Sequence, residues 1–393
     1  MDTGSASDAE WAARADRSEL NVYARLPFTP VRGEGCYLYD AAGKKYLDFY
    51  GGHAVAITGH SHPKVAEAIA SQARQLLFYS SAVLSRVRVE ATELLLKHAP
   101  HPDSRIFHCV SGTEANEVAF KIARKLTGRK KIISFEKSFH GRTLASLTAG
   151  GLEKYRATAG PVLVPHHVHV PFGDLAALEG ELKDDAAAVI CETIQSLAGI
   201  FTAPDEFHRA MAEATKKAGA YLIYDEIQTG FGRTGTYFFA DGVGVKPDLI
   251  TLAKGIASGI PAAAVIVAPH LASKIGSGDQ GTTFGGGPVA MAAMKATLEI
   301  IESDGLVANA ALMGNLIFQK VKRIGAIKAA RGRGLLIGLE LDRAASKVVA
   351  AMIAKGVVAG TSSEPSTLRL LPPLTIGEKE VDQFVTALSE VLT

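Results

Sequence analysis

The sequence has few cysteines, few aromatic residues and almost no net charge. Its 393 residues include three cysteines and one tryptophan, and aromatic residues make up 7%. Cys36, Cys109 and Cys191 are far apart in apolar surroundings, a pattern that argues against disulfides or a metal site and predicts buried thiols in a reducing cytoplasm. The 42 basic and 40 acidic residues leave a net charge of +2, so we expect no nucleic-acid partner.

Long apolar runs are also missing, and we therefore expect no membrane partner. The chain is too long for one ordinary domain, and its 47% hydrophobic and 21% charged residues favour a large buried core. We expect an N-terminal segment (1–50) that packs with the small domain, a large domain (51–285) and a small C-terminal α+β domain (286–393).

Short apolar runs alternate with helical segments through the middle of the chain. This alternation predicts an α/β fold, with a mainly parallel sheet flanked by helices on both faces. The strand candidates are 105–110, 131–135, 186–191, 221–224, 249–253 and 263–268. Outside this region, a glycine-containing alternating pattern at 33–49 predicts a small antiparallel meander, and Pro63 is expected to open a helix.

Two of the predicted strands end abruptly in charged side chains. The run 221–224 is followed by Asp225, and the run 249–253 is followed by Lys254. In open α/β sheets, ligands bind beyond the carboxyl ends of the strands. A lysine there suits a cofactor that forms a Schiff base, with the nearby acid as the partner of a ring nitrogen. For this pair alone, a structural ion pair at a sheet edge is the alternative.

Further polar groups follow other strands. Ser111-Gly112-Thr113 lies between a strand and a helix, so it predicts either a phosphate site made of free backbone N–H groups or an ordinary helix N-cap. The loops 139–143 and 281–288 and the residue Glu192 add polar groups at other strand ends. His60 and His62 resemble metal ligands, but no third ligand is near them, so loop packing is favoured and no metal is expected.

Taken in order, these motifs resemble the class III aminotransferases, enzymes of fold type I that use pyridoxal 5′-phosphate (PLP). The resemblance covers the chain from Tyr23 to the C-terminus. Its most specific pieces are 111–117, 139–143, 225–235, 253–255 and 282–286. Within the family, the chain is most similar to the acetylornithine aminotransferase branch, through 23–27, 139–143 and 368–374.

The resemblance implies a role for each matching residue. Lys254 would carry the covalent link to PLP, Asp225 would bond its pyridine nitrogen, and Gln228 would reach its phenolic oxygen. The other cofactor-binding residues that it implies are Ser111, Gly112, Thr113, Phe139, His140, Glu192, Ile227 and Thr283. Because family members are homodimers with shared active sites, Thr283 would come from the other subunit. The implied substrate-binding residues are Tyr23, Arg142, Arg369 and Leu197.

Elementary chemistry supports the main roles independently. A buried carboxylate at Asp225 would raise the pKa of the ring nitrogen, which must keep its proton for the cofactor to withdraw electrons. Lys254, once released, is a neutral general base. Arg369 suits a substrate carboxylate because its planar guanidinium pairs with both oxygens.

Leu197 departs from the family pattern. Relatives usually have Glu-Pro-Val/Ile-Gln-Gly-Glu-Gly-Gly where this chain has 192–199, and the glutamate that pairs with the arginine at position 369 is here Leu197. We expect Arg369 to stay unpaired unless Glu364 reaches it, and to favour substrates with a carboxylate for it in both half-reactions. The alternative is an Arg369 exposed enough for water to serve. Gly287, where asparagine is usual, is a second departure.

The predicted activity is therefore a ping-pong aminotransferase. An acetylornithine-like or other ω-amino acid would be the donor and a keto acid, foremost 2-oxoglutarate, the acceptor. Alternatives are an alanine–glyoxylate or β-alanine–pyruvate type aminotransferase, and an aminomutase, racemase or decarboxylase on the same fold. A non-catalytic relative is a further alternative, against which the retention of Lys254 and Asp225 argues.

Overall fold

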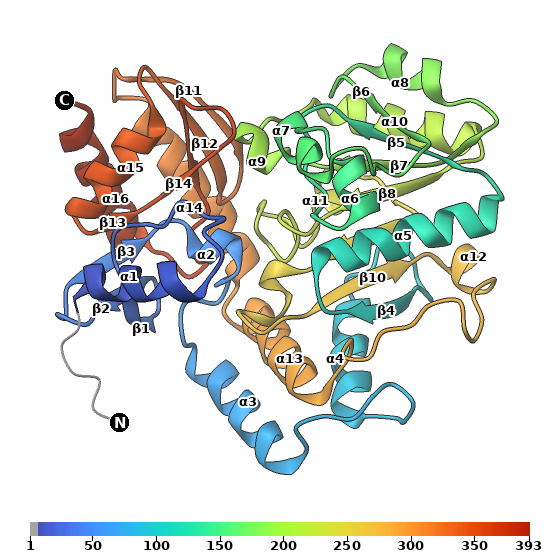
Figure 1. Ribbon diagram of the computed structural model, residues 1–393, viewed down its shortest axis with the longest axis horizontal. Helices are drawn as coiled ribbons and strands as arrows, with labels where there is room; N and C mark the ends of the chain where they lie inside the picture. Colours follow the sequence, from blue (N-terminus) through green and yellow to red (C-terminus); the bar gives the residue numbers. More distant parts are fainter. Residues whose placement is uncertain (1–6) are drawn as a thin grey trace.

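The computed structural model describes residues 7–393 and places them in two bodies that lie side by side (Figure 1). One body is built around a seven-stranded sheet and holds the middle of the chain. The other combines the strands near the N-terminus with the C-terminal helices and strands, as the blue and red segments of Figure 1 show. Within the described part of the chain, no helix has the length and apolar character needed to cross a membrane.

The large sheet has the strand order β4-β10-β9-β8-β7-β5-β6. Its strands are β4 (Arg105–Cys109), β5 (Lys131–Phe135), β6 (His167–Val170), β7 (Ala186–Glu192), β8 (Tyr221–Asp225), β9 (Leu249–Leu252) and β10 (Ala263–Val267). β10 runs antiparallel to both of its neighbours, whereas the pairs from β9 to β6 are parallel. The short link between β9 and β10 holds only a 3-10 helix, Lys254–Ala257, which is too short for a parallel crossover.

Both faces of this sheet are buried. Neighbouring residues such as Ile132 and Ile133, or Leu222 and Ile223, contribute to two different hydrophobic clusters. On one face α5 (Gly112–Thr127) packs against β9 and β10, and on the other face α10 (Asp205–Lys217) packs against β8. Burial on two sides explains why these strands are almost continuously apolar. The predicted α/β class, a mainly parallel sheet flanked by helices, is confirmed.

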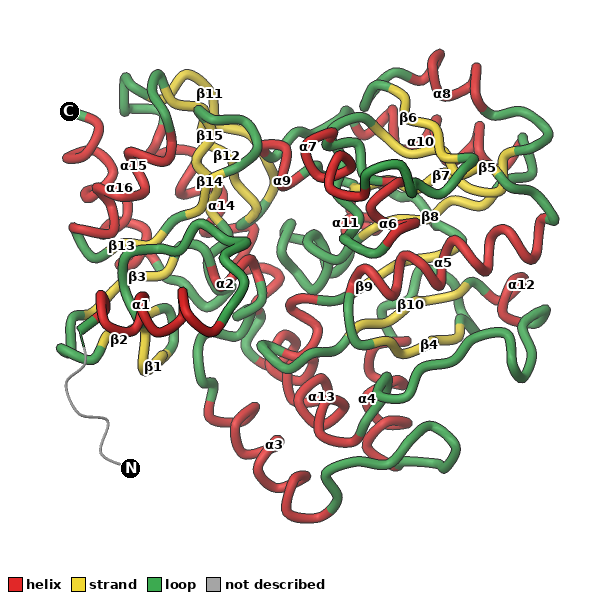
Figure 2. Tube along the Cα trace, viewed as in Figure 1, coloured by secondary structure: helices red, strands yellow, loops and turns green. Residues whose placement is uncertain are grey.

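The remaining helices cover the sheets and join the two bodies (Figure 2). They are α1 (Asp8–Ser18), α2 (Gly51–Ala54), α3 (Pro63–Gln75), α4 (Arg86–Leu96), α6 (Leu144–Ala149), α7 (Glu153–Arg156), α8 (Leu175–Glu181), α9 (Ser196–Gly199), α11 (Phe239–Val243), α12 (Pro269–Ala272), α13 (Pro288–Ser303), α14 (Leu306–Val321), α15 (Ala345–Ala354) and α16 (Glu378–Leu392), with a 3-10 turn at Ala157–Ala159. Pro63 opens α3, and Gly287 is the N-cap residue of α13, where glycine is tolerated.

Two four-stranded sheets belong to the other body. One has the order β1-β2-β3-β13 and the other β11-β12-β15-β14. Their strands are β1 (Pro30–Glu34), β2 (Tyr37–Asp40), β3 (Lys45–Asp48), β11 (Ile327–Arg333), β12 (Leu336–Leu341), β13 (Val357–Val358), β14 (Gly360–Thr361) and β15 (Thr367–Leu370). β3 pairs in parallel with β13, so Leu47 lies opposite Val357 and the N-terminal strands join the C-terminal part. The domain boundaries at 50 and 285 stay a prediction.

The three cysteines are buried in the fold, and the two loop histidines, His60 and His62, form hydrogen bonds within it. All three cysteines are buried free thiols. His60 Nε2 lies 2.7 Å from Asp48 Oδ2, and His62 Nδ1 accepts a hydrogen bond from the Lys64 N–H at the start of α3. Across residues 7–393, no cluster of three or more potential ligands could hold a metal ion.

Candidate active site

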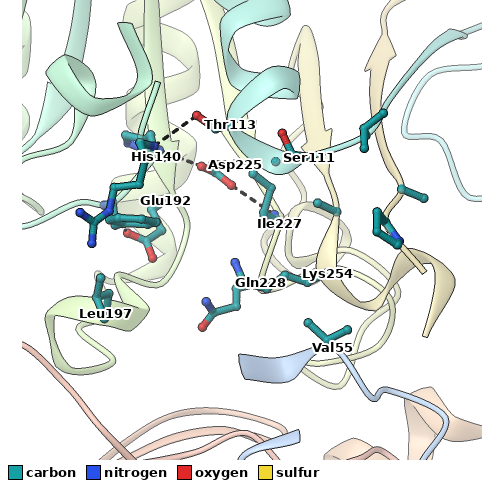
Figure 3. A pocket seen from close by; sticks show the side chains of 18 of the residues that line it. Val55, Ser111, Thr113, His140, Glu192, Leu197, Asp225, Ile227, Gln228 and Lys254 are labelled. Carbon is teal, nitrogen blue, oxygen red and sulfur yellow. Dashed lines mark hydrogen bonds and ion pairs between the residues drawn. The ribbon is translucent and has the colours of Figure 1, made fainter. Parts of the chain in front are cut away.

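A cavity of about 430 Å³ lies at the carboxyl ends of β7, β8 and β9 (Figure 3). Strand register places Glu192, Asp225 and Thr251 side by side at this edge. Most of the residues predicted from the sequence line the cavity. They are Ser111, Gly112, Thr113, Phe139, His140, Arg142, Glu192, Leu197, Asp225, Ile227, Gln228 and Lys254. The strand ends therefore gather residues that are up to about 140 positions apart in the chain.

Asp225 is a fixed, buried carboxylate at the floor of the cavity. It is the last residue of β8 and is 4% exposed. Its Oδ2 accepts hydrogen bonds from His140 Nδ1 at 2.8 Å and from Asn116 Nδ2 at 2.9 Å, and its Oδ1 accepts one from the Ile227 N–H. These donors stabilise the charged carboxylate, which can hold a proton on a ring nitrogen placed in the cavity.

Lys254 is held at the cavity by a tight turn. It opens the 3-10 helix after β9 with a positive φ of 46°, and its neighbour Gly255 packs so closely on Ile57 that a Cβ would lie 2.8 Å from Ile57 Cδ1. Burial lowers the pKa of Lys254, an effect opposed by the charges of Asp225 and Glu192. A lower pKa increases the neutral fraction of the amine, which is the form that attacks a carbonyl.

The start of α5 forms a cradle for an anion. Ser111 is its N-cap, and Ser111 Oγ accepts a hydrogen bond from the Glu114 N–H at 3.3 Å. The capping interpretation is therefore correct, yet the N–H groups of Gly112 and Thr113 still face the cavity end of the helix. A Cβ at Gly112 would lie 2.6 Å from Ile227 Cδ1, so only glycine leaves this space open. Free N–H groups at a helix N-terminus attract a phosphate.

Glu192 and Gln228 are tied to the short helix α9. Glu192 accepts hydrogen bonds from the Phe139 N–H at 3.0 Å and the Ser196 N–H at 2.8 Å, and burial raises its pKa to about 7. Gln228 Oε1 accepts a hydrogen bond from Ser196 Oγ, which leaves its amide donors available. Ile227 and Phe139 add apolar walls.

Together these groups fit PLP. The lysine matches its aldehyde, the carboxylate its ring nitrogen, the α5 N-terminus its phosphate, and the apolar walls its aromatic ring. Figure 3 shows Asp225, Gln228 and Lys254 among the side chains that line this cavity.

Arg369 lies on β15 beside the cavity and is 2% exposed. Its guanidinium donates to the Thr361 carbonyl at 2.6 Å, to Ser196 Oγ at 3.3 Å and to the Tyr50 hydroxyl at 2.9 Å. No carboxylate of residues 7–393 forms an ion pair with it, Glu364 included. The alternative of a water-exposed Arg369 is wrong, because the side chain is buried by β14, α9 and Tyr50.

Of the predicted residues Arg142, Tyr23 and Thr283, only Arg142 lines the cavity. Its guanidinium carbon lies 3.9 Å from the centre of the Tyr155 ring. Tyr23 and Thr283 are exposed and do not line the cavity of their own chain.

Asn116, Tyr50 and Ser196 are the residues that sequence reasoning missed. Asn116 falls inside the motif 111–117 and Ser196 inside the stretch 192–199, so both had a signal, whereas Tyr50 had none.

Comparison with known proteins decides the family. Residues 20–392 match the family model described as aminotransferase class-III. The chain belongs to the class-III aminotransferase family. Two relatives are the acetylornithine aminotransferases of Archaeoglobus fulgidus, 40% identical over 96% of this chain and 98% of the relative, and of Listeria innocua, 41% identical over 94% and 96%.

Solved structures of aminotransferases have the same fold. The ornithine aminotransferase of Toxoplasma gondii superposes with a TM-score of 0.94 at 27% identity, covering 99% of this chain and 96% of that one. An (S)-enantioselective ω-transaminase of Thermomicrobium roseum gives 0.91 at 32% identity, covering 98% and 99%. This class-III aminotransferase is a PLP-dependent enzyme. When bound, PLP supplies an electron-withdrawing ring that stabilises negative charge on the substrate carbon.

Proposed function

We propose that this aminotransferase transfers the amino group of an acetylornithine-like or other ω-amino acid to 2-oxoglutarate by a ping-pong mechanism. The observation that carries the proposal is Arg369, a buried cation without a carboxylate partner in residues 7–393, next to a cavity that also holds Lys254. Such a cation binds a substrate carboxylate strongly. The names of the relatives from Archaeoglobus and Listeria support the donor class.

The proposed roles of the residues follow from their contacts. Asp225 holds the proton of the ring nitrogen, since hydrogen bonds from His140 and Asn116 fix the position of its carboxylate. Lys254 takes a proton from the substrate carbon and returns it, because burial lowers its pKa and so increases the neutral fraction of the released amine. The N–H groups of Gly112 and Thr113 bind the phosphate, with the Ser111 cap fixing the helix start.

The remaining proposed contacts complete the pocket. Phe139 and Ile227 contact the two ring faces, Gln228 reaches the phenolic oxygen, and Glu192 orients the Phe139 backbone and α9. Arg142 and Tyr23 are proposed for the rest of the substrate.

We also propose a homodimer with shared sites. A stretch of exposed apolar side chains includes Leu77, Tyr79 and Leu84, and the adjacent Phe78 packs on Phe284 with ring centres 5.1 Å apart. Thr283 is therefore next to an apolar surface that a second copy can cover. In the dimer, Thr283 would reach the phosphate of the partner's site. The three buried free thiols fit the reducing cytoplasm expected for this enzyme.

An alanine–glyoxylate or β-alanine–pyruvate type aminotransferase is the second candidate, because one solved structure that resembles this chain is an ω-transaminase. The test is a screen of ¹⁵N-labelled donors against 2-oxoglutarate, pyruvate and glyoxylate, read by mass spectrometry. Label transfer from N-acetylornithine to glutamate would support the leading assignment. Transfer only from donors that are not ω-amino acids, or only to alanine or glycine, would contradict it.

A further inference from the structure

A left-handed turn links the cavity to Arg369. All four residues of α2 have positive φ, between 56° and 65°, and two of them, His53 and Ala54, are not glycine. Asp48, 1% exposed, holds this turn, because its Oδ1 accepts hydrogen bonds from the Tyr50 N–H at 2.7 Å and the Gly51 N–H at 2.9 Å. L-residues rarely adopt this conformation, and it persists where surrounding contacts impose it, often at functional sites.

The turn brings His53 into contact with Tyr50, a hydrogen-bond partner of Arg369. Arg369 Nη2 donates to the Tyr50 hydroxyl at 2.9 Å, and the same hydroxyl lies 2.8 Å from His53 Nδ1. When His53 is neutral with its proton on Nε2, its Nδ1 accepts the Tyr50 proton; when His53 is protonated, its Nδ1–H donates to the Tyr50 oxygen, which can still accept from Arg369. The His53 side chain is at the surface. Three side chains thus form a chain of hydrogen bonds from solvent to the buried guanidinium.

The charges that face His53 are positive, and carboxylates face the other two side chains. Partial burial, followed by the positive charges of Arg369 and Lys254, lowers the pKa of His53. Asp48 and Tyr155 face Tyr50, and Glu192 and Tyr155 face Arg369. His53 is therefore a titratable group whose protonation must respond to any anion that binds at Arg369.

We propose that His53 is a positioning residue that, through Tyr50, holds the Arg369 guanidinium for a substrate carboxylate and makes that binding depend on pH. The inference rests on the proposed function, in which Arg369 binds a substrate carboxylate. In the neutral state, the Tyr50–His53 hydrogen bond orients the hydroxyl that receives Arg369 Nη2.

The direction of the pH dependence follows from the charges. A bound carboxylate offsets the positive charge that lowers the pKa of His53, so this pKa rises when the anion binds. A group whose pKa rises on binding takes up a proton, and binding is therefore tighter at lower pH. A rise of one unit would correspond to about a tenfold gain in affinity below both pKa values.

The experiment measures the binding of glutarate, a dicarboxylate with no reacting group, to the PLP-loaded enzyme by calorimetry between about pH 5 and about pH 8, a range that includes the lowered pKa of His53. His53→Asn keeps an acceptor where Nδ1 was, tolerates the left-handed backbone and cannot titrate. His53→Ala removes the acceptor, and Tyr50→Phe removes the hydroxyl that lies between His53 and Arg369.

We expect wild-type enzyme to bind glutarate at least about threefold more tightly at the acidic end, with proton uptake. His53→Asn should bind glutarate at alkaline pH as tightly as the wild type does, but its affinity should rise less toward acidic pH. His53→Ala and Tyr50→Phe should weaken binding at every pH. Glu192 contributes to the pH dependence of binding equally in all variants, so the difference between wild type and His53→Asn gives the contribution of His53. A wild-type slope in His53→Asn, or wild-type affinity in His53→Ala, would overturn the inference.

Arg369→Ala separates this inference from the proposed function. If Arg369→Ala leaves glutarate binding unchanged, the carboxylate role of Arg369 is wrong. If Arg369→Ala weakens binding while the His53 variants behave as wild type, only the role of His53 is wrong.

Discussion

Nδ1 of His140 lies 2.8 Å from Oδ2 of Asp225, and both side chains are almost completely buried. Asn116 donates to the same oxygen, so two side chains hold one carboxylate at the end of β8. This arrangement fixes the Asp225 carboxylate beneath the cavity. The geometry is what a carboxylate needs to hold a proton on a ring nitrogen.

Asp225→Asn should slow transamination by about three or more orders of magnitude, because removing the charge removes the driving force for the ring nitrogen to keep its proton. Single-turnover kinetics with saturating donor measures the step directly. PLP content and melting temperature serve as controls for folding. A loss of only a few fold in a PLP-loaded variant would show that Asp225 is not the ring partner.

Thr283 offers a test of the shared site. Lys254→Ala removes the amine, and Thr283→Asp places a negative charge where the partner's phosphate is proposed to bind, so each parent should be nearly inactive. In an equal mixture after subunit exchange, about a quarter of all sites would hold both intact residues. Recovered activity near that fraction supports the shared site. No recovery, with exchange verified by mass spectrometry, counts against it.

Leu197→Glu should shift donor preference. Leu197 follows Ser196, whose hydroxyl accepts a hydrogen bond from Arg369 at 3.3 Å, so a glutamate here can reach the guanidinium. Pairing would neutralise Arg369 when the donor has no carboxylate for it, and we expect kcat/KM for ω-amines to rise about tenfold or more relative to α-amino acids. Leu197→Gln, of the same size without charge, is the matched control. An unchanged ratio in folded Leu197→Glu enzyme would refute the idea.

Asp48→Ala should destabilise the protein by about 2 to 4 kcal/mol, because two backbone N–H groups of the left-handed turn and the His60 ring lose a buried acceptor. Urea unfolding monitored by fluorescence gives the free energy of unfolding. Asp342→Ala, which removes an exposed ion pair with Arg343, should change it by less than about 0.5 kcal/mol. Equal effects of the two substitutions would show that Asp48 does not hold the turn.

Much of the large sheet was predictable because its strands are buried on both faces and are almost continuously apolar. β6 was missed because His167 and His169 interrupt its apolar pattern. The antiparallel direction of β10 was also missed, since strand direction depends on the length of the connection at Lys254–Ala257 rather than on the strand's own residues.

The candidate site was predictable where a side chain follows a strand directly, as Asp225 and Lys254 do. Tyr50 and His53 could not be predicted, because their contact with Arg369 arises from the pairing of distant segments and from a left-handed turn. A GGHA sequence does not by itself indicate four residues with positive φ. Likewise, the contact between Ser196 and Arg369 spans two bodies of the fold.

The central claim is that Lys254 is the residue that binds PLP covalently, and borohydride reduction followed by peptide mapping tests it most directly. The reduced enzyme should carry one pyridoxyl group per chain, on Lys254, because this is the lysine at the cavity whose pKa burial lowers. Lys254→Ala should bind PLP without covalent attachment and should not transaminate. A pyridoxyl group on any other lysine of the wild-type enzyme would contradict the account.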